Sequence, residues 1–169
     1  MDFYLVIIIA LAVLATADLV VGVSNDAVNF LNSAIGSKAI SFRTVMIIAS
    51  LGVAAGAIFS SGLMEVARKG IFNPDLFYFD EIMVIFMAVM LTDILLLDFF
   101  NTLGMPTSTT VSIVFELLGA AVAISLVKIY WGNADESLYE FINVSKASQI
   151  ILGILLSVFI AFTVGAVVQ

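Results

Sequence analysis

Residues 3–32 read FYLVIIIALAVLATADLVVGVSNDAVNFLN, an apolar run that ends abruptly in amide and carboxylate side chains. The run from Phe3 to Val23 is long enough to cross the hydrocarbon core of a bilayer, which takes about 20 residues. The polar side chains that follow it are Asn25, Asp26, Asn29 and Asn32. Because polar groups are costly to bury between membrane-length apolar runs, this cluster indicates a pathway for a substrate or an ion.

The whole chain has the composition of a membrane protein. Of its 169 residues 63% are hydrophobic and only 11% are charged, whereas soluble domains contain about 25% charged residues. The mean hydropathy is +1.22. Apolar runs of membrane-spanning length lie near residues 3–23, 44–63, 82–100, 111–130 and 148–168. We therefore predict an all-α integral membrane protein with about five transmembrane helices and two broken or re-entrant segments, in a single domain that covers residues 1–169.

The chain contains neither cysteine nor histidine. Any proton or cation chemistry must therefore use carboxylates, amides, hydroxyls and backbone carbonyls, which suit hard cations such as Na⁺ better than soft metals. No cofactor is expected. The formal net charge of −7 argues against nucleic acid as a partner, because nucleic-acid binding needs a basic surface.

A second interruption, GMPTSTT at residues 104–110, separates two apolar runs without the charges of a surface loop. Gly104 and Pro106 are expected to break the helix there. Irregular backbone at membrane depth is tolerated only where protein or a water-filled cavity surrounds it. The hydroxyls of Thr107 to Thr110 then stand where a new helix begins, and a helix N-terminus attracts oxyanions such as phosphate. Taken alone, the segment is better interpreted as an ordinary N-cap.

The first cluster has helical spacing. On a helix that continues past Gly22, one face carries Asp18, Asn25, Asn29 and Asn32. Asp26 and Ser33 lie on an adjoining face. Asp26 and Asn25 together can form a Na⁺ site, while amide NH₂ groups can instead donate to an oxyanion. Hydrogen bonding between helices is the alternative, and it is favoured for Asp18 or Asn32 taken singly.

The basic residues do not settle the membrane topology. Basic residues favour the cytoplasmic side of a membrane. Arg68 and Lys69 therefore place one end of the 44–63 span in the cytoplasm, but Lys38 and Arg43 place the other end there too. A broken or re-entrant stretch near residues 24–40 would resolve the conflict. It would also be resolved if one of the two basic pairs had only a weak effect on the topology.

Further carboxylates lie near the second interruption. Glu116 is four residues after Ser112 within a strongly apolar run, so it faces part of the hydroxyl cluster and is a candidate coupling carboxylate. Asp93, Asp98 and Asn101 precede the break, and they either line the same cavity or lie near a membrane interface.

Together the two segments resemble those of the inorganic phosphate transporter family. That family carries a Gly-x-Asn-Asp-x-x-Asn signature after an apolar helix and a later Pro-x-Ser-Thr-Thr run, seen here as VSNDAVNFLNSAIGSKA and GMPTSTTVSIV. The resemblance covers roughly residues 15–125. The chain departs from it at Val23, where glycine is usual, at Val111, where many members carry histidine, and at Phe115, where glycine is common.

The resemblance implies a secondary transporter, not an enzyme, that moves inorganic phosphate with Na⁺ or H⁺. It implies that phosphate is bound by residues of both segments, namely Asn25, Asp26, Asn29, Ser108, Thr109 and Thr110. The residues that bind or couple the cation would be Asn25, Asp26, Asn29 and Glu116.

Family members resemble two inverted repeats, each with a copy of the signature, and this chain carries one copy. We therefore expect one repeat or a fragment, paired with a second repeat or with another copy of itself in the lipid of a cell membrane. Two alternatives stay open: transport of another tetrahedral oxyanion such as sulfate, and a noncatalytic membrane subunit. An intramembrane aspartyl protease is disfavoured, because the Tyr-Asp and Gly-x-Gly-Asp signatures are missing.

Overall fold

The computed structural model describes residues 3–60, 70–105, 107–132 and 135–168. In these ranges, helices long and apolar enough to cross a membrane are α1 (Phe3–Ser37), α2 (Phe42–Phe59), α4 (Phe79–Leu103), α5 (Thr109–Trp131) and α7 (Val144–Val168). A 3-10 turn, η1 (Pro74–Leu76), precedes α4, and the one-turn helix α6 (Leu138–Phe141) precedes α7. The prediction of an all-α integral membrane protein with five transmembrane helices is confirmed.

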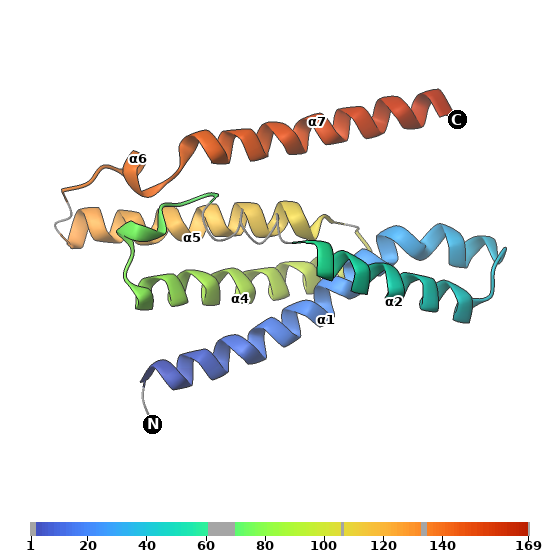
Figure 1. The fold of residues 1–169 in the computed structure, drawn as a ribbon, viewed down its shortest axis with the longest axis horizontal. Coiled ribbons are helices and arrows are strands. Elements are labelled where there is room, and N and C mark those ends of the chain that lie inside the picture. Colours follow the sequence, from blue (N-terminus) through green and yellow to red (C-terminus); the bar gives the residue numbers. More distant parts are fainter. Residues whose placement is uncertain (1–2, 61–69, 106, 133–134, 169) are drawn as a thin grey trace.

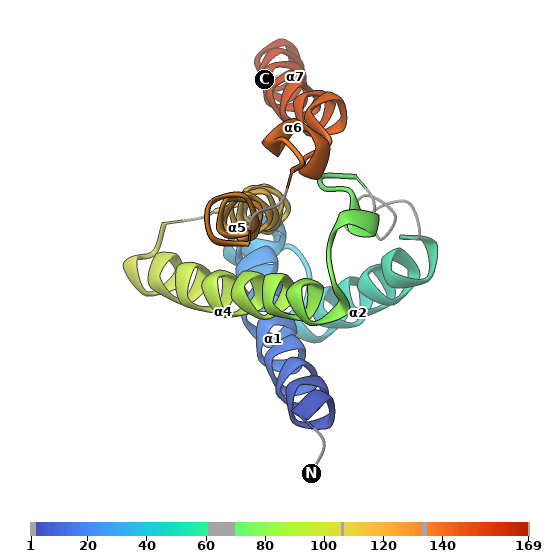
Figure 2. The same cartoon turned by 90° about the vertical axis from the view of Figure 1, so that its left-hand side faces the viewer.

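The centre of the fold is the antiparallel pair α4 and α5, and α1 packs mainly against α4 (Figure 1). Helix α1 crosses this pair and reaches the end where α4 turns into α5, and α2 then folds back beside the second half of α1. Helix α7 stands apart from α1, α2 and α4 in both views (Figure 2). The two interrupted segments are therefore brought to the same end of the bundle.

The best-packed part of the core lies at the opposite end of α4 and α5. There Phe72 pairs with Ile142 in an isolated antiparallel bridge, and both side chains are at least 95% buried. Asn143 N–H donates to the carbonyl of Ile71 at 2.9 Å. The segments that lead into α4 and α7 are packed against the bundle in their described parts, because they are rich in large apolar side chains. Arg68 and Lys69 lie outside the described residues.

The first polar segment is not broken where a break was expected. Helix α1 runs without interruption through the cluster to Ser37, and the chain turns only at residues 38–41. No glycine or proline occurs from Val23 to Ile35, so nothing in the local sequence ends the helix earlier. The turn uses Lys38 with a φ of 54°, and α2 starts with Ser41 as its N-cap. At 35 residues α1 is about 50 Å long, well beyond one membrane thickness.

The second break lies where the sequence predicted it. Helix α4 ends at Gly104, whose φ of +68° belongs to the left-handed region that glycine adopts without strain. The N–H groups of Gly104 and Met105 bond back to the last turn of α4. Ser108 then caps α5, since its Oγ accepts from Val111 N at 3.4 Å. Pro106 lies outside the described residues.

We expect Gly104→Ala to destabilise the protein by about 1 kcal/mol, because the left-handed conformation strains any residue with a Cβ atom. No heavy atom lies within 4 Å of a Cβ built at Gly104, so steric clash adds nothing to this cost. The matched control is Gly119→Ala, in the middle of α5, where a Cβ also has open space and the backbone is helical. SDS-induced unfolding in mixed micelles should show destabilisation at position 104 and none at position 119. Equal effects would contradict this account of the turn.

Candidate substrate site

The two polar segments meet through the backbone of the second one. The side-chain Nδ2 groups of Asn25 and Asn29 both donate to the carbonyl oxygen of Thr107, each at 2.9 Å. Asn25 is 1% exposed, whereas Asn29 reaches the same oxygen from the surface. One helical turn of α1 is thus attached to the residue that leads into α5.

The carboxylate of the cluster makes the second connection. Thr109 Oγ1 donates to Asp26, with distances of 3.1 and 3.4 Å to the two carboxylate oxygens. Thr109 is also the first residue of α5, so Asp26 lies beside the positive end of a 23-residue helix. Gly22 lies where α1 meets α5, and a Cβ at that position would be in ordinary van der Waals contact, 3.9 Å from the Thr109 methyl group.

A cavity of about 450 Å³ opens beside this connection. Its lining residues are Leu96, Thr107, Ser108, Val111, Ser112, Phe115 and Glu116. Ser112 Oγ donates to Glu116 Oε1 at 2.7 Å, so the predicted link between the hydroxyl run and this carboxylate is present in the cavity wall. Cavities of this size hold small ligands. Hydroxyls, the first turn of α5 and one carboxylate, that of Glu116, therefore line a space large enough for a small oxyanion.

The sequence matches the phosphate transporter family over residues 22–169, which is most of the chain. The chain belongs to the phosphate transporter family. Three relatives of known name are each called "Putative phosphate permease". The protein of Thermococcus kodakarensis is 31% identical over 79% of this chain, that of Helicobacter pylori is 32% identical over 64%, and that of Mycobacterium bovis is 29% identical over 65%. No solved structure matches the chain significantly.

The chain spans a minor part of these relatives. The matched segment is 30% of the Thermococcus kodakarensis protein, 21% of the Helicobacter pylori protein and 20% of the Mycobacterium bovis protein. The family match nevertheless includes both polar segments and all of α2, α4, α5 and α7.

The structure locates the positions where this member departs from the family signatures. Val23 is 43% exposed, away from the contact between α1 and Thr107, so the valine there does not disturb that contact. Val111 and Phe115 both line the cavity. Because these two side chains are apolar, the polar side chains that line the cavity are the hydroxyl groups and Glu116.

Several candidate residues take no part in the hydrogen bonds that join the two segments. Their side chains are exposed in the structure, and they are Asn32, Ser33, Asp98, Asn101 and Thr110. Thr110 follows Thr109 along α5 and faces another direction. For this family member, the contact surface between the segments is narrower than the motif alone indicates.

Sequence reasoning missed two features of the site. The first is that a backbone carbonyl, that of Thr107, joins the segments, which no side-chain pattern reveals. The second is a group of carboxylates that includes Glu116 of the cavity wall: Asp93 lies within interaction range of both Asp18 and Glu116. Asp93 is 2% exposed. The sequence did contain a sign of this group, because Asp18 and Asp93 are isolated carboxylates within apolar runs.

Within the described ranges, no three acidic side chains have the arrangement of a metal site.

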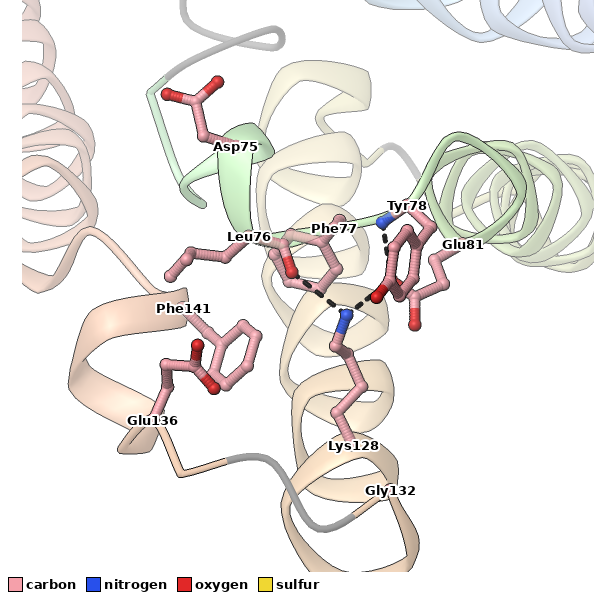
Figure 3. Close-up of a pocket in the computed structure, with 9 residues that line it drawn as sticks. All are labelled: Asp75, Leu76, Phe77, Tyr78, Glu81, Lys128, Gly132, Glu136 and Phe141. Carbon is pink, nitrogen blue, oxygen red and sulfur yellow. Dashed lines mark hydrogen bonds and ion pairs between the residues drawn. The ribbon is translucent and has the colours of Figure 1, made fainter.

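A second cavity, of about 430 Å³, lies at the opposite end of α4 and α5 (Figure 3). Lys128 points into it and donates to Glu81 Oε2 at 2.8 Å and to the carbonyl of Leu76 at 3.0 Å. Its ammonium group also lies 4.6 Å from the ring centroid of Tyr78. Because these contacts occupy the lysine, we interpret this cavity as part of the scaffold that joins the loops to the helices.

Proposed function

We propose that this chain forms a substrate-binding part of a transporter that carries inorganic phosphate across a cell membrane together with Na⁺ or H⁺. The family membership and the names of the relatives support phosphate as the substrate. The single observation that carries the proposal is the attachment of Asn25, Asp26 and Asn29 to the start of α5 beside a 450 Å³ cavity.

In this proposal phosphate binds at the N-terminus of α5. The residues that contact it are those implied by the signatures, namely Asn25, Asp26, Asn29, Ser108, Thr109 and Thr110. Helix N–H groups and hydroxyls donate to the phosphate oxygens. Thr110 and Asn29 are exposed here, so phosphate would reach them from the open side of the contact. A second repeat, or a second copy of the chain, would cover that side.

The coupling cation is assigned to the same region. Asp26 supplies the negative charge, and the side-chain carbonyls of Asn25 and Asn29 supply neutral oxygens, because their NH₂ groups already donate to Thr107. A carboxylate with amide oxygens suits Na⁺, and the same carboxylate can instead carry H⁺. Glu116, on the cavity wall, is the second coupling candidate.

We expect the purified chain to bind radiolabelled phosphate saturably and to keep it in excess sulfate. Protonated phosphate can donate a hydrogen bond to Asp26, whereas sulfate at neutral pH has no proton to donate. The measurement is equilibrium binding in detergent, with and without Na⁺, followed by uptake into proteoliposomes under a Na⁺ or proton gradient. Asn32→Ala serves as a control, since this exposed amide belongs to the same helix but not to the contact.

The outcomes separate the alternatives. Displacement of phosphate by sulfate at equal concentration would assign the site to tetrahedral oxyanions in general. Absence of phosphate binding by correctly folded protein would contradict the proposal and favour a noncatalytic membrane subunit.

A further inference from the structure

Three helices each place one carboxylate at the same depth of the bundle. Asp18 comes from α1, Asp93 from α4 and Glu116 from α5, and Asp93 stands within interaction range of the other two. Asp93 is the most buried of the three, at 2% exposure. Its place is near the middle of α4, 10 residues before the helix ends at Leu103, so it is far from either end of the membrane span.

Each of these carboxylates has one buried oxygen without a hydrogen-bond partner. The atoms are Asp18 Oδ1, Asp93 Oδ1 and Glu116 Oε2. The other oxygen of Glu116 accepts from Ser112 at 2.7 Å. An ionised carboxylate accepts hydrogen bonds but donates none, so two ionised neighbours cannot satisfy each other. In a carboxyl–carboxylate pair, by contrast, a single proton supplies the missing donor.

Electrostatics leads to the same conclusion. Like charges at hydrogen-bonding distance in a weakly polar environment repel strongly, and such pairs hold a proton between them. Asp18 on α1 and Glu116 on α5 both interact with Asp93 from helices packed against α4, and both are acidic. Three negative charges at this depth would be far more costly than one or two.

From this geometry we infer that Asp18, Asp93 and Glu116 form a proton-holding site in the middle of the bundle, separate from the phosphate contact at Asp26. The inference rests on the proposed function in one respect: for coupling by H⁺, it names this cluster, in place of Asp26, as the site that carries the proton, and leaves Asp26 as the Na⁺ candidate. When one proton is bound, it is held between two of these carboxylates, so that the O–H of one donates to a carboxylate oxygen of its neighbour. Transfer breaks the O–H bond at the first group and forms one at the second, so the net charge of the cluster is unchanged.

Glu116 connects the proton-holding site to the phosphate cavity. It lines the cavity together with Ser112, Ser108 and Thr107, while its free oxygen is on the side of the carboxylate cluster. A proton can therefore enter from the cavity at Glu116 and move to Asp93 and Asp18. Because the cavity also borders the start of α5, a change at the phosphate site reaches this entrance directly.

The test is infrared spectroscopy of the purified full chain in lipid. We expect a carbonyl band of a buried carboxylic acid that persists above neutral pH, shifts in D₂O and is unchanged when Na⁺ replaces choline. Asp93→Asn should remove this band, because Asp93 is the carboxylate that interacts with both of the others. Glu116→Gln leaves the pair of Asp18 and Asp93 and should keep the band. Asp98→Asn is the matched control on α4, because its side chain is exposed, and it should keep the band.

The wild-type spectrum alone can overturn the inference, so the test does not depend on folding of the variants. Absence of the band at neutral pH would show that the three groups are ionised together. Loss of the band on adding Na⁺ would assign the site to a metal cation instead. Phosphate binding is measured on the same samples: a band without phosphate binding contradicts only the proposed function, and binding without a band contradicts only the proton-holding site.

Discussion

Asp26→Asn is expected to reduce cation-dependent phosphate uptake by up to about 100-fold. Asp26 joins α1 to the first residue of α5, because its two carboxylate oxygens accept from Thr109 Oγ1. Hydrogen bonds to charged groups are worth up to about 3 kcal/mol, which corresponds to a factor of about 100 in binding. The amide keeps the size and one acceptor oxygen of the carboxylate, so the contact with Thr109 and the fold should survive.

The measurement is uptake of labelled phosphate by vesicles that contain equal amounts of inserted wild-type or variant protein. Asp98→Asn is again the control, since it removes the same charge from an exposed position on α4. We expect its uptake to match the wild type. Normal cation-dependent uptake by the Asp26→Asn protein would exclude Asp26 from the mechanism and leave Glu116 as the coupling candidate.

The local features of this fold follow from the sequence because their causes are local. Apolar runs of membrane length predicted the five spans, and Gly104 predicted the end of α4. The face shared by Asp18 and Asn25 followed from helical spacing, and both side chains do turn toward the bundle. The extent of α1 could also have been read more closely, since residues 23–35 contain no helix breaker.

The site depends on distances that no local pattern contains. The carbonyl of Thr107 accepts from Asn25 across 82 residues of sequence, and that contact is set by how α1 crosses α4 and α5. The same crossing brings Asp18 to Asp93, which looked like unrelated single carboxylates in two apolar runs. Motif residues such as Thr110 were assigned to the site by resemblance. The direction in which the Thr110 side chain points depends on the rotation of α5 about its axis, and the sequence alone does not determine that rotation.

Lys128→Met is expected to destabilise the protein by about 3 kcal/mol. Lys128 and Glu81 form an ion pair at 2.8 Å whose side chains are only 17% and 20% exposed. Removing one partner of a poorly solvated pair leaves the other charge without compensation, which costs about 3–5 kcal/mol when the pair is fully buried. The lysine also bonds to the carbonyl of Leu76, and so it attaches the segment before α4 to the end of α5.

A second substitution separates the ion pair from this loop contact. Glu81→Gln retains an acceptor for the backbone N–H of Tyr78, which donates to the Glu81 side chain at 2.7 Å. In the Lys128→Met background it should recover about 1 kcal/mol or more, because no unpaired charge remains. Lys146→Met, at an exposed position near the start of α7, is the matched control and should change stability little. If the double variant were as unstable as the sum of the two single variants, the ion pair would contribute nothing, and the role of Lys128 would be limited to the Leu76 carbonyl and the aromatic rings around it.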